Sequence, residues 1–162
     1  MSSDYLVALG SNRRHRAYGD PRSVVIAAME ECAALGTVLR RSDVIASAPI
    51  GPARRRFANA ACLIESEYDP LSMLAGLKHM ERAFGRRAGQ AWGDRVLDCD
   101  IVLWSGGRFA SPALTIPHVA FRSRSFVLRP AAAIAPGWRD PVSGLTLRQL
   151  DARLTAARPL PR

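Results

Sequence analysis

The feature that most constrains the fold is the order in which strand-like and helix-like patterns follow one another along the chain. Short apolar runs bounded by glycine, proline or polar residues predict strands over 4–9, 37–47, 57–66 and 95–104. Apolar residues at helical spacing predict two helices, one after the first strand and one after the third. This order is typical of an α+β fold with a ferredoxin-like βαββαβ core and a mostly antiparallel sheet.

Both predicted helices have clear start and stop signals. Asp20-Pro21 and Asp69-Pro70 each place an N-cap aspartate before a first-turn proline. Gly36 and Gly85 mark the ends. Beyond the core we expect a tight turn over 105–107, an irregular segment over 109–117, and short C-terminal helices over 125–134 and 145–154. The whole chain, 1–162, is predicted to be a single domain with a mobile tail over 155–162.

The composition excludes some functional classes but does not identify one. The net charge of +9 would suit a polyanionic partner, but a solvated basic surface explains it equally well. Cys32, Cys62 and Cys99 form no CxxC pair, which argues against a zinc site or a disulfide framework and favours a reducing compartment. The sequence shows no signal-peptide pattern and no apolar stretch of membrane-spanning length. We therefore expect a cytoplasmic enzyme or binding domain.

The fourth predicted strand, RVLDCDIVLW, carries two carboxylates in an otherwise apolar run. Because successive strand residues point to opposite faces, Asp98 and Asp100 should project together, with Cys99 facing the other way. Two carboxylates on one face need a positive partner. One candidate is an arginine clamp, and the other is divalent metal, because Mg²⁺ prefers one or two carboxylates together with waters and substrate phosphates.

Four spaced motifs carry a resemblance to the 6-hydroxymethyl-7,8-dihydropterin pyrophosphokinase family. They are ALGSN (8–12), GP followed by FANAA (51–61), WGDRVLDCDIVLW (92–104) and IPHVAFRSRSFVLRPAAAIAP (116–136). The resemblance covers most of the chain and implies a ferredoxin-like fold. It also implies transfer of pyrophosphate from ATP to the hydroxymethyl group of a reduced pterin in folate biosynthesis, with release of AMP.

The resemblance assigns roles to individual residues. Two Mg²⁺ ions would sit on Asp98 and Asp100, with ATP as co-substrate. Phe57 and Phe126 would sandwich the pterin ring, and Asn59 would read its polar edge. The implied catalytic residues are Arg86, Arg87, Arg95, Asp98 and Asp100. Implied ATP contacts are Glu81, Trp92, Ile101, Thr115, His118 and Arg124, and implied pterin contacts are Ser47, Ile50, Phe57, Asn59, Trp92 and Phe126.

The main departures from the pattern of the family are Ala91, Asp94 and Val119, and the loop Ser47-Ala48-Pro49-Ile50 is a milder change. They leave open a relative with an altered substrate, or one that only binds nucleotide or pterin. A basic ferredoxin-like module that binds RNA is a third reading, but such modules display aromatic residues on the sheet, where this chain has two aspartates. We expect no nucleic-acid and no membrane partner, and the resemblance suggests a monomer.

Overall fold

The computed structural model describes residues 1–47, 56–85 and 96–156. Its main sheet is antiparallel and contains β1 (Ser3–Ser11), β2 (Thr37–Arg41), β3 (Ile45–Ser47), β4 (Phe57–Ser66) and β5 (Asp98–Trp104). The strand order is β2-β4-β1-β5, and β3 also pairs with β4. This order places the first strand between the third and the last strands of the core, which confirms the predicted ferredoxin-like α+β fold.

The two predicted core helices form where the sequence signals place them. Helix α1 (Pro21–Glu31) continues into a 3₁₀ turn (Cys32–Ala34), and α2 spans Pro70–Ala83. Asp20 accepts a hydrogen bond from the Ser23 amide at 2.9 Å, and Asp69 accepts one from the Ser72 amide at 2.7 Å. Each aspartate thus satisfies one of the free amides of a first helical turn.

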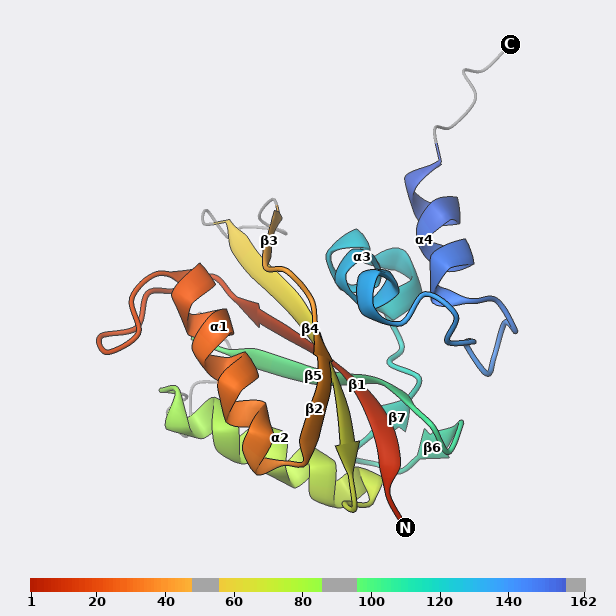
Figure 1. Cartoon of the computed structure of the whole chain (residues 1–162), viewed down its shortest axis with the longest axis horizontal. Coiled ribbons are helices and arrows are strands. Elements are labelled where there is room, and N and C mark those ends of the chain that lie inside the picture. Colours follow the sequence, from red (N-terminus) through yellow and green to blue (C-terminus); the bar gives the residue numbers. More distant parts are fainter. Residues whose placement is uncertain (48–55, 86–95, 157–162) are drawn as a thin grey trace.

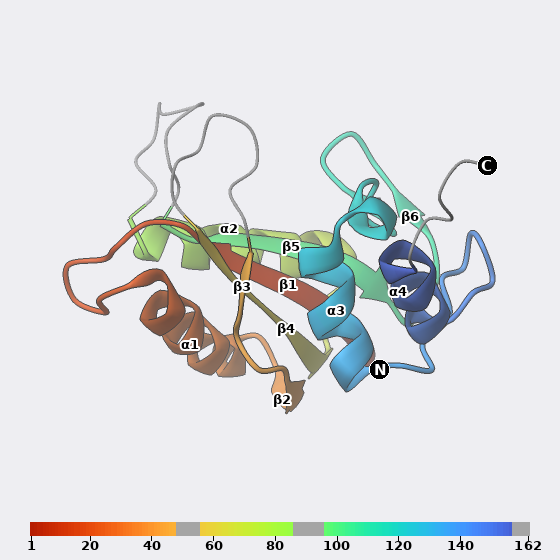
Figure 2. The same ribbon diagram turned by 90° about the horizontal axis from the view of Figure 1, so that it is seen from above.

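Figure 1 shows α1 and α2 on one side of the sheet and the two C-terminal helices on the other. These helices are α3 (Ser125–Ile134) and α4 (Leu147–Thr155), preceded by a 3₁₀ turn, η2 (Phe121–Ser123). Figure 2 shows the same arrangement from above, with α3 beside the sheet and α4 beside α3. Helices therefore cover both faces of the sheet, but α3 covers only part of the second face.

Alternation along β1 divides the interior into two apolar layers. Tyr5, Val7 and Leu9 pack with α1 and α2, whereas Leu6 packs with α3, α4 and Phe121. Apolar burial on both faces is the main stabilising contribution for such a three-layer arrangement. In the described part of the chain, no helix is both long and apolar enough to cross a membrane.

Several predicted boundaries were wrong. The strand predicted over 95–104 begins only at Asp98, with Val96 and Leu97 outside it, and the helix predicted over 145–154 begins at Leu147. The segment 37–47 is not one strand, because Ser42 breaks it: the Ser42 hydroxyl accepts a hydrogen bond from the Ala61 amide at 2.8 Å, and the chain then turns toward β3. The segment 109–117 is not irregular throughout, because β6 (Phe109–Ala110) pairs with β7 (Thr115–Ile116) in a short hairpin. The predicted mobile tail falls mostly on residues 157–162, outside the described ranges, and Thr155 still belongs to α4.

Candidate active site

The two aspartates of β5 lie on the same face of the sheet, as the alternation predicts. Asp98 is paired with Gly10 of β1 and Asp100 with Ala8, and both aspartates line one cleft. Cys99, between them, is 2% exposed and packs in the layer on the other face. Asp98 is partly buried, whereas the Asp100 side chain is 52% exposed, so solvent solvates at least one of the two charges.

A β-bulge explains how one strand serves both the core and an open cleft. The pairing of β5 with β1 shifts by one residue, because Val7 is opposite Ile101 while Leu6 is opposite Leu103. Val102 and Leu103 therefore both pack in the layer beneath α3 and Phe121. The same face is apolar where α3 covers it and acidic where it does not.

The cleft has a volume of about 310 Å³ and draws its walls from four elements. Strands β1, β4 and β5 form the floor, and the first turn of α3 with the residue before it forms one wall. Six side chains predicted from the sequence meet here, and Gly10 lies among them on the central strand. These six are Phe57, Asn59, Asp98, Asp100, Arg124 and Phe126.

The end of the cleft near β4 is suited to a flat, amphipathic ligand. Phe57 and Phe126 supply aromatic surface from β4 and α3, and both are only partly buried. Asn59 is 6% exposed, and its Nδ2 donates a hydrogen bond to Oγ of Ser47 at 2.7 Å. An amide held in this way keeps an acceptor oxygen and a second N–H for a ligand.

The end near β5 is suited to phosphate and a cation. His118 Nε2 lies 3.8 Å from Oδ2 of Asp100, while its Nδ1 accepts a hydrogen bond from the Ala120 amide at 3.1 Å. In the neutral ring the proton is therefore on Nε2, directed toward Asp100. Arg124 adds a guanidinium 5.8 Å from the centre of the Phe126 ring. A donor imidazole and a guanidinium beside two carboxylates can bind phosphate around a metal ion.

The carboxylate pair fits the donor set that Mg²⁺ uses. Among the described residues no group of three or more His, Cys, Asp or Glu side chains could enclose a metal. Mg²⁺ does not require such a cage, because it keeps several waters and takes one or two carboxylates together with substrate phosphates. The exposed Asp100 leaves space for those waters and phosphates.

Cys99 contributes no nucleophile to this site. Burial raises the pKa of its thiol well above the ordinary value, and the nearby charges of Glu81, Asp100 and Asp98 act in the same direction. The thiol therefore stays protonated at neutral pH.

Four predicted ATP contacts lie outside the residues that line the cleft: His118, whose ring lies near Asp100, and Glu81, Ile101 and Thr115. Glu81 is 2% exposed at the open edge of β5, where it accepts a hydrogen bond from the Cys99 amide at 3.1 Å. It also lies 3.5 Å from Lys78, its neighbour on the helix. The Ile101 side chain is buried beneath the sheet, and Thr115 is exposed on β7. The five predicted residues Ile50, Arg86, Arg87, Trp92 and Arg95 fall outside the described ranges.

Gly10 was missed as a site residue, although the motif ALGSN contains it. A Cβ built on Gly10 would lie 3.0 Å from Oδ1 of Asn59, so a side chain here would press on the amide. Gly10 also pairs with both Asn59 and Asp98, and it lies on the floor between the two ends of the cleft. The signal available in the sequence was a glycine near the end of a predicted strand and inside a family motif, because glycine in a strand often marks a close approach of other groups.

The fold and the cleft together define a ferredoxin-like domain with a site of the kind that suits phosphoryl or pyrophosphoryl transfer. A family model described as 7,8-dihydro-6-hydroxymethylpterin-pyrophosphokinase (HPPK) matches residues 6–136. The chain belongs to this pyrophosphokinase family.

Three curated relatives named 2-amino-4-hydroxy-6-hydroxymethyldihydropteridine pyrophosphokinase support the same assignment. The protein from Methylorubrum extorquens is 35% identical over 157 residues, which cover 95% of this chain and 94% of that one. The protein from Pseudomonas aeruginosa is 36% identical over 83% of this chain and 82% of its own length. The match to the Synechocystis protein is 37% identical and covers 70% of this chain but only 58% of that one.

A solved structure supports the fold. The Plasmodium falciparum HPPK-DHPS with pteroate superimposes with a TM-score of 0.71 over 94% of this chain, at 14% sequence identity. The match covers 44% of that longer chain. At this level of identity the likeness shows the fold alone.

Proposed function

We propose that this chain catalyses the reaction for which its family is named. It transfers pyrophosphate from ATP to the hydroxymethyl group of 6-hydroxymethyl-7,8-dihydropterin and releases AMP, in folate biosynthesis. The single observation that carries the proposal is the cleft that Asp98, Asp100 and Arg124 line together with Phe57, Asn59 and Phe126. A nucleoside triphosphate needs charged side chains, and a flat heterocycle needs aromatic and amide side chains. The reaction needs the two sets side by side.

Asp98 and Asp100 would hold two Mg²⁺ ions. When bound, the ions neutralise the triphosphate and lower the pKa of the attacking hydroxyl. The side chains of the chain then have the tasks of positioning and charge stabilisation, which dominate phosphoryl-type transfer. His118 and Arg124 bind phosphate oxygens as donors, and Arg86, Arg87 and Arg95 would add further guanidinium groups.

Phe57 and Phe126 stack on the pterin, and Asn59 hydrogen-bonds its edge, so that the hydroxymethyl oxygen points toward the β-phosphorus. A bond forms from that oxygen to the β-phosphorus, and the bond from the β-phosphorus to the bridging oxygen of the α-phosphate breaks. The hydroxyl proton leaves to solvent, and the electron pair of the broken bond stays on AMP. Ile50 and Trp92 would complete the pterin site, and Glu81, Ile101 and Thr115 the nucleotide site, as the resemblance implies.

We further propose that the chain acts as a monomer in the cytoplasm. Cys32, Cys62 and Cys99 are free and buried, which suits a reducing compartment.

The test is a measurement of AMP formed from ATP by the purified protein. AMP should appear only when both 6-hydroxymethyl-7,8-dihydropterin and Mg²⁺ are present. A folded protein that binds ATP and the pterin, but forms no AMP, would establish a relative that has lost transfer. Val119 motivates this alternative, because it is 77% exposed where the family commonly has an aromatic residue.

A further inference from the structure

His118 and Arg124, both proposed phosphate ligands, lie on either side of the 3₁₀ turn η2. The backbone bonds of this turn are long: Phe121 N to His118 O is 3.4 Å, Ser123 N to Ala120 O is 3.3 Å, and Arg124 N to Phe121 O is 3.4 Å. Typical N–H···O bonds are about 2.7–3.2 Å. Two side-chain bonds within the segment are shorter, from Ser123 Oγ to the Ala120 carbonyl and from the Ala120 amide to His118 Nδ1, both at 3.1 Å. With its backbone bonds this long, the turn gains further rigidity from contacts with other parts of the chain.

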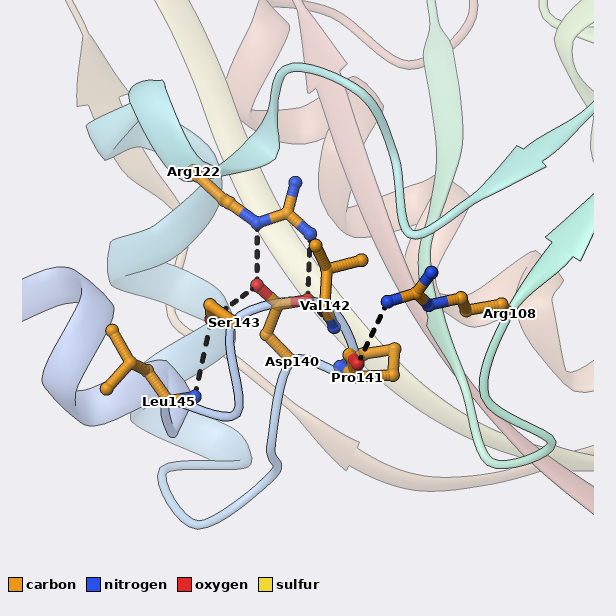
Figure 3. A network of polar contacts seen from close by, with 7 residues as sticks. All are labelled: Arg108, Arg122, Asp140, Pro141, Val142, Ser143 and Leu145. Atoms are coloured by element: carbon orange, nitrogen blue, oxygen red, sulfur yellow. Dashed lines mark hydrogen bonds and ion pairs between the residues drawn. The ribbon is translucent and has the colours of Figure 1, made fainter.

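Arg122, in the middle of this turn, makes the strongest of those contacts. Its Nε donates to Oδ2 of Asp140 at 2.6 Å, and its Nη2 donates to Oδ1 at 2.7 Å (Figure 3). The guanidinium also lies 4.6 Å from the ring centre of Phe121, which is fully buried. We call this bidentate pair the Arg122–Asp140 clamp. Short, paired, charge-assisted bonds of this kind fix orientation as well as distance.

Asp140 is itself held rigidly. It is 0% exposed, and its carboxylate also accepts from Ser143 Oγ at 2.7 Å and from the Val142 amide at 3.0 Å. Its own amide donates to the Leu145 carbonyl at 2.8 Å. Burial alone would raise the pKa of Asp140, but the bonds from Arg122 and Ser143 outweigh it and hold the pKa well below the ordinary value. The clamp is thus charged and fully hydrogen-bonded throughout the neutral range.

We infer that Asp140, acting through Arg122, is a positioning residue for the nucleotide end of the cleft. This inference rests on the proposed function. The clamp fixes the turn that leads directly into Arg124, so loss of the clamp lets the guanidinium of Arg124 move away from the phosphates. A misplacement of about 1 Å at a reacting group can cost roughly 10²-fold in rate.

The pterin end should not depend on the clamp. Phe126 lies in the first turn of α3, and Leu128, Ala131 and Ile134 anchor that helix in the apolar layer on the sheet. This packing holds the body of α3 without Arg122. Arg124, by contrast, is the residue at which η2 and α3 join: its amide donates to the Phe121 carbonyl at 3.4 Å, and its carbonyl accepts from the Val127 and Leu128 amides at 3.0 Å. The clamp therefore predicts a selective defect, at the nucleotide end only, which a general loss of stability would not produce.

The experiment compares Asp140→Asn and Arg122→Lys with Arg139→Ala as the matched control. Arg139 donates to the Gly144 carbonyl at 2.8 Å, so this hydrogen bond supports the same loop but is not part of the clamp. Binding of α,β-methylene-ATP with Mg²⁺ is measured by calorimetry, and KM for each substrate from AMP release. In Asp140→Asn the Kd for the analogue and KM for ATP should rise about 10- to 100-fold, the usual cost of losing a group that orients a ligand. KM for the pterin should stay within about twofold.

Arg122→Lys keeps the charge but loses the bidentate bond, so its defect should be intermediate. Unchanged analogue affinity in folded Asp140→Asn would overturn the inference, and so would an equal defect in Arg139→Ala or an equal rise in both KM values. If Asp140→Asn does not fold, the same binding and KM measurements on Arg122→Lys test the inference. A wild type that binds the analogue without forming AMP would defeat the proposed function, while the binding comparison still tests the clamp.

Discussion

Nδ2 of Asn59 donates a hydrogen bond to Oγ of Ser47 at 2.7 Å, and this bond links β4 to the short strand β3 beside the cleft. The bond fixes the plane of the amide, and it decides which polar atoms of Asn59 remain for a ligand.

Ser47→Ala should therefore weaken pterin recognition without altering the nucleotide end. Loss of one neutral hydrogen bond is worth about 1 kcal/mol, which corresponds to a rise in KM for the pterin of roughly fivefold. KM for ATP should be unchanged. Ser105→Ala is the control, because Ser105 Oγ accepts a hydrogen bond from the Asp4 amide at 2.9 Å, outside the cleft. A pterin KM that rises equally in both variants would contradict the assigned role.

Gly10→Ala should affect the same subsite by a different route. The added methyl group would lie 3.0 Å from Oδ1 of Asn59 and would displace the amide by a few tenths of an ångström. We expect KM for the pterin to rise by about tenfold, of the order of 1.4 kcal/mol, while the far-UV circular dichroism spectrum stays that of the wild type. Gly137→Ala is the control, because a Cβ there meets no atom within 4 Å. Wild-type kinetics in Gly10→Ala would show that the cleft floor tolerates a side chain.

Asp98→Ala and Asp100→Ala should each reduce turnover severely, because each removes a proposed metal ligand. Loss of one preorganised charge-stabilising group typically costs on the order of 10²–10³-fold in kcat. Mg²⁺ titrations of AMP release should also shift to higher concentrations in both variants. Asp43→Ala, at an exposed aspartate between β2 and β3, should behave as the wild type. Near-normal turnover in either cleft variant would rule out the metal role of that residue.

Glu81→Ala should lower the free energy of unfolding, because the Cys99 amide loses its buried acceptor. An unsatisfied buried donor costs about 1–3 kcal/mol. Glu81→Gln keeps an acceptor, so its loss of unfolding free energy should be smaller. Glu30→Ala, at an exposed position of α1, is the control for replacing a glutamate by alanine. Urea denaturation measures all three. A large loss of ATP-analogue affinity with unchanged stability would instead favour the nucleotide contact that the resemblance implies.

Tyr5 should make stability fall at alkaline pH. Its hydroxyl donates to the Tyr68 carbonyl at 2.6 Å, and burial, together with the charge of Asp69, raises its pKa to about 12. Because the folded pKa lies above the unfolded value of about 10, this stabilisation is complete below pH 10 and is lost as the pH rises toward 12. Tyr5→Phe should be less stable than the wild type at pH 8 and should show a smaller alkaline decline in urea denaturation. Tyr18→Phe, at a 43% exposed tyrosine, should keep the wild-type decline.

Local signals in the sequence were sufficient for most of the fold. The Asp20 and Asp69 caps, the bounds of β4 and the residues of α3 follow from patterns that depend on near neighbours. The break at Ser42 could not be predicted, because it depends on a hydrogen bond to Ala61, which is distant in sequence. The same reason applies to the hairpin of β6 and β7, whose strands are too short for a periodic signal.

By itself, the sequence determined that Asp98 and Asp100 share one face of a strand, since a period of two residues needs no tertiary information. Only the tertiary structure decided that this face is open at the aspartates and covered at Leu103, because a bulge and the placement of α3 are non-local. It alone also brought Gly10 against Asn59 and Arg122 against Asp140. Contacts between residues far apart in sequence arise when the whole core packs, and no local pattern encodes their geometry.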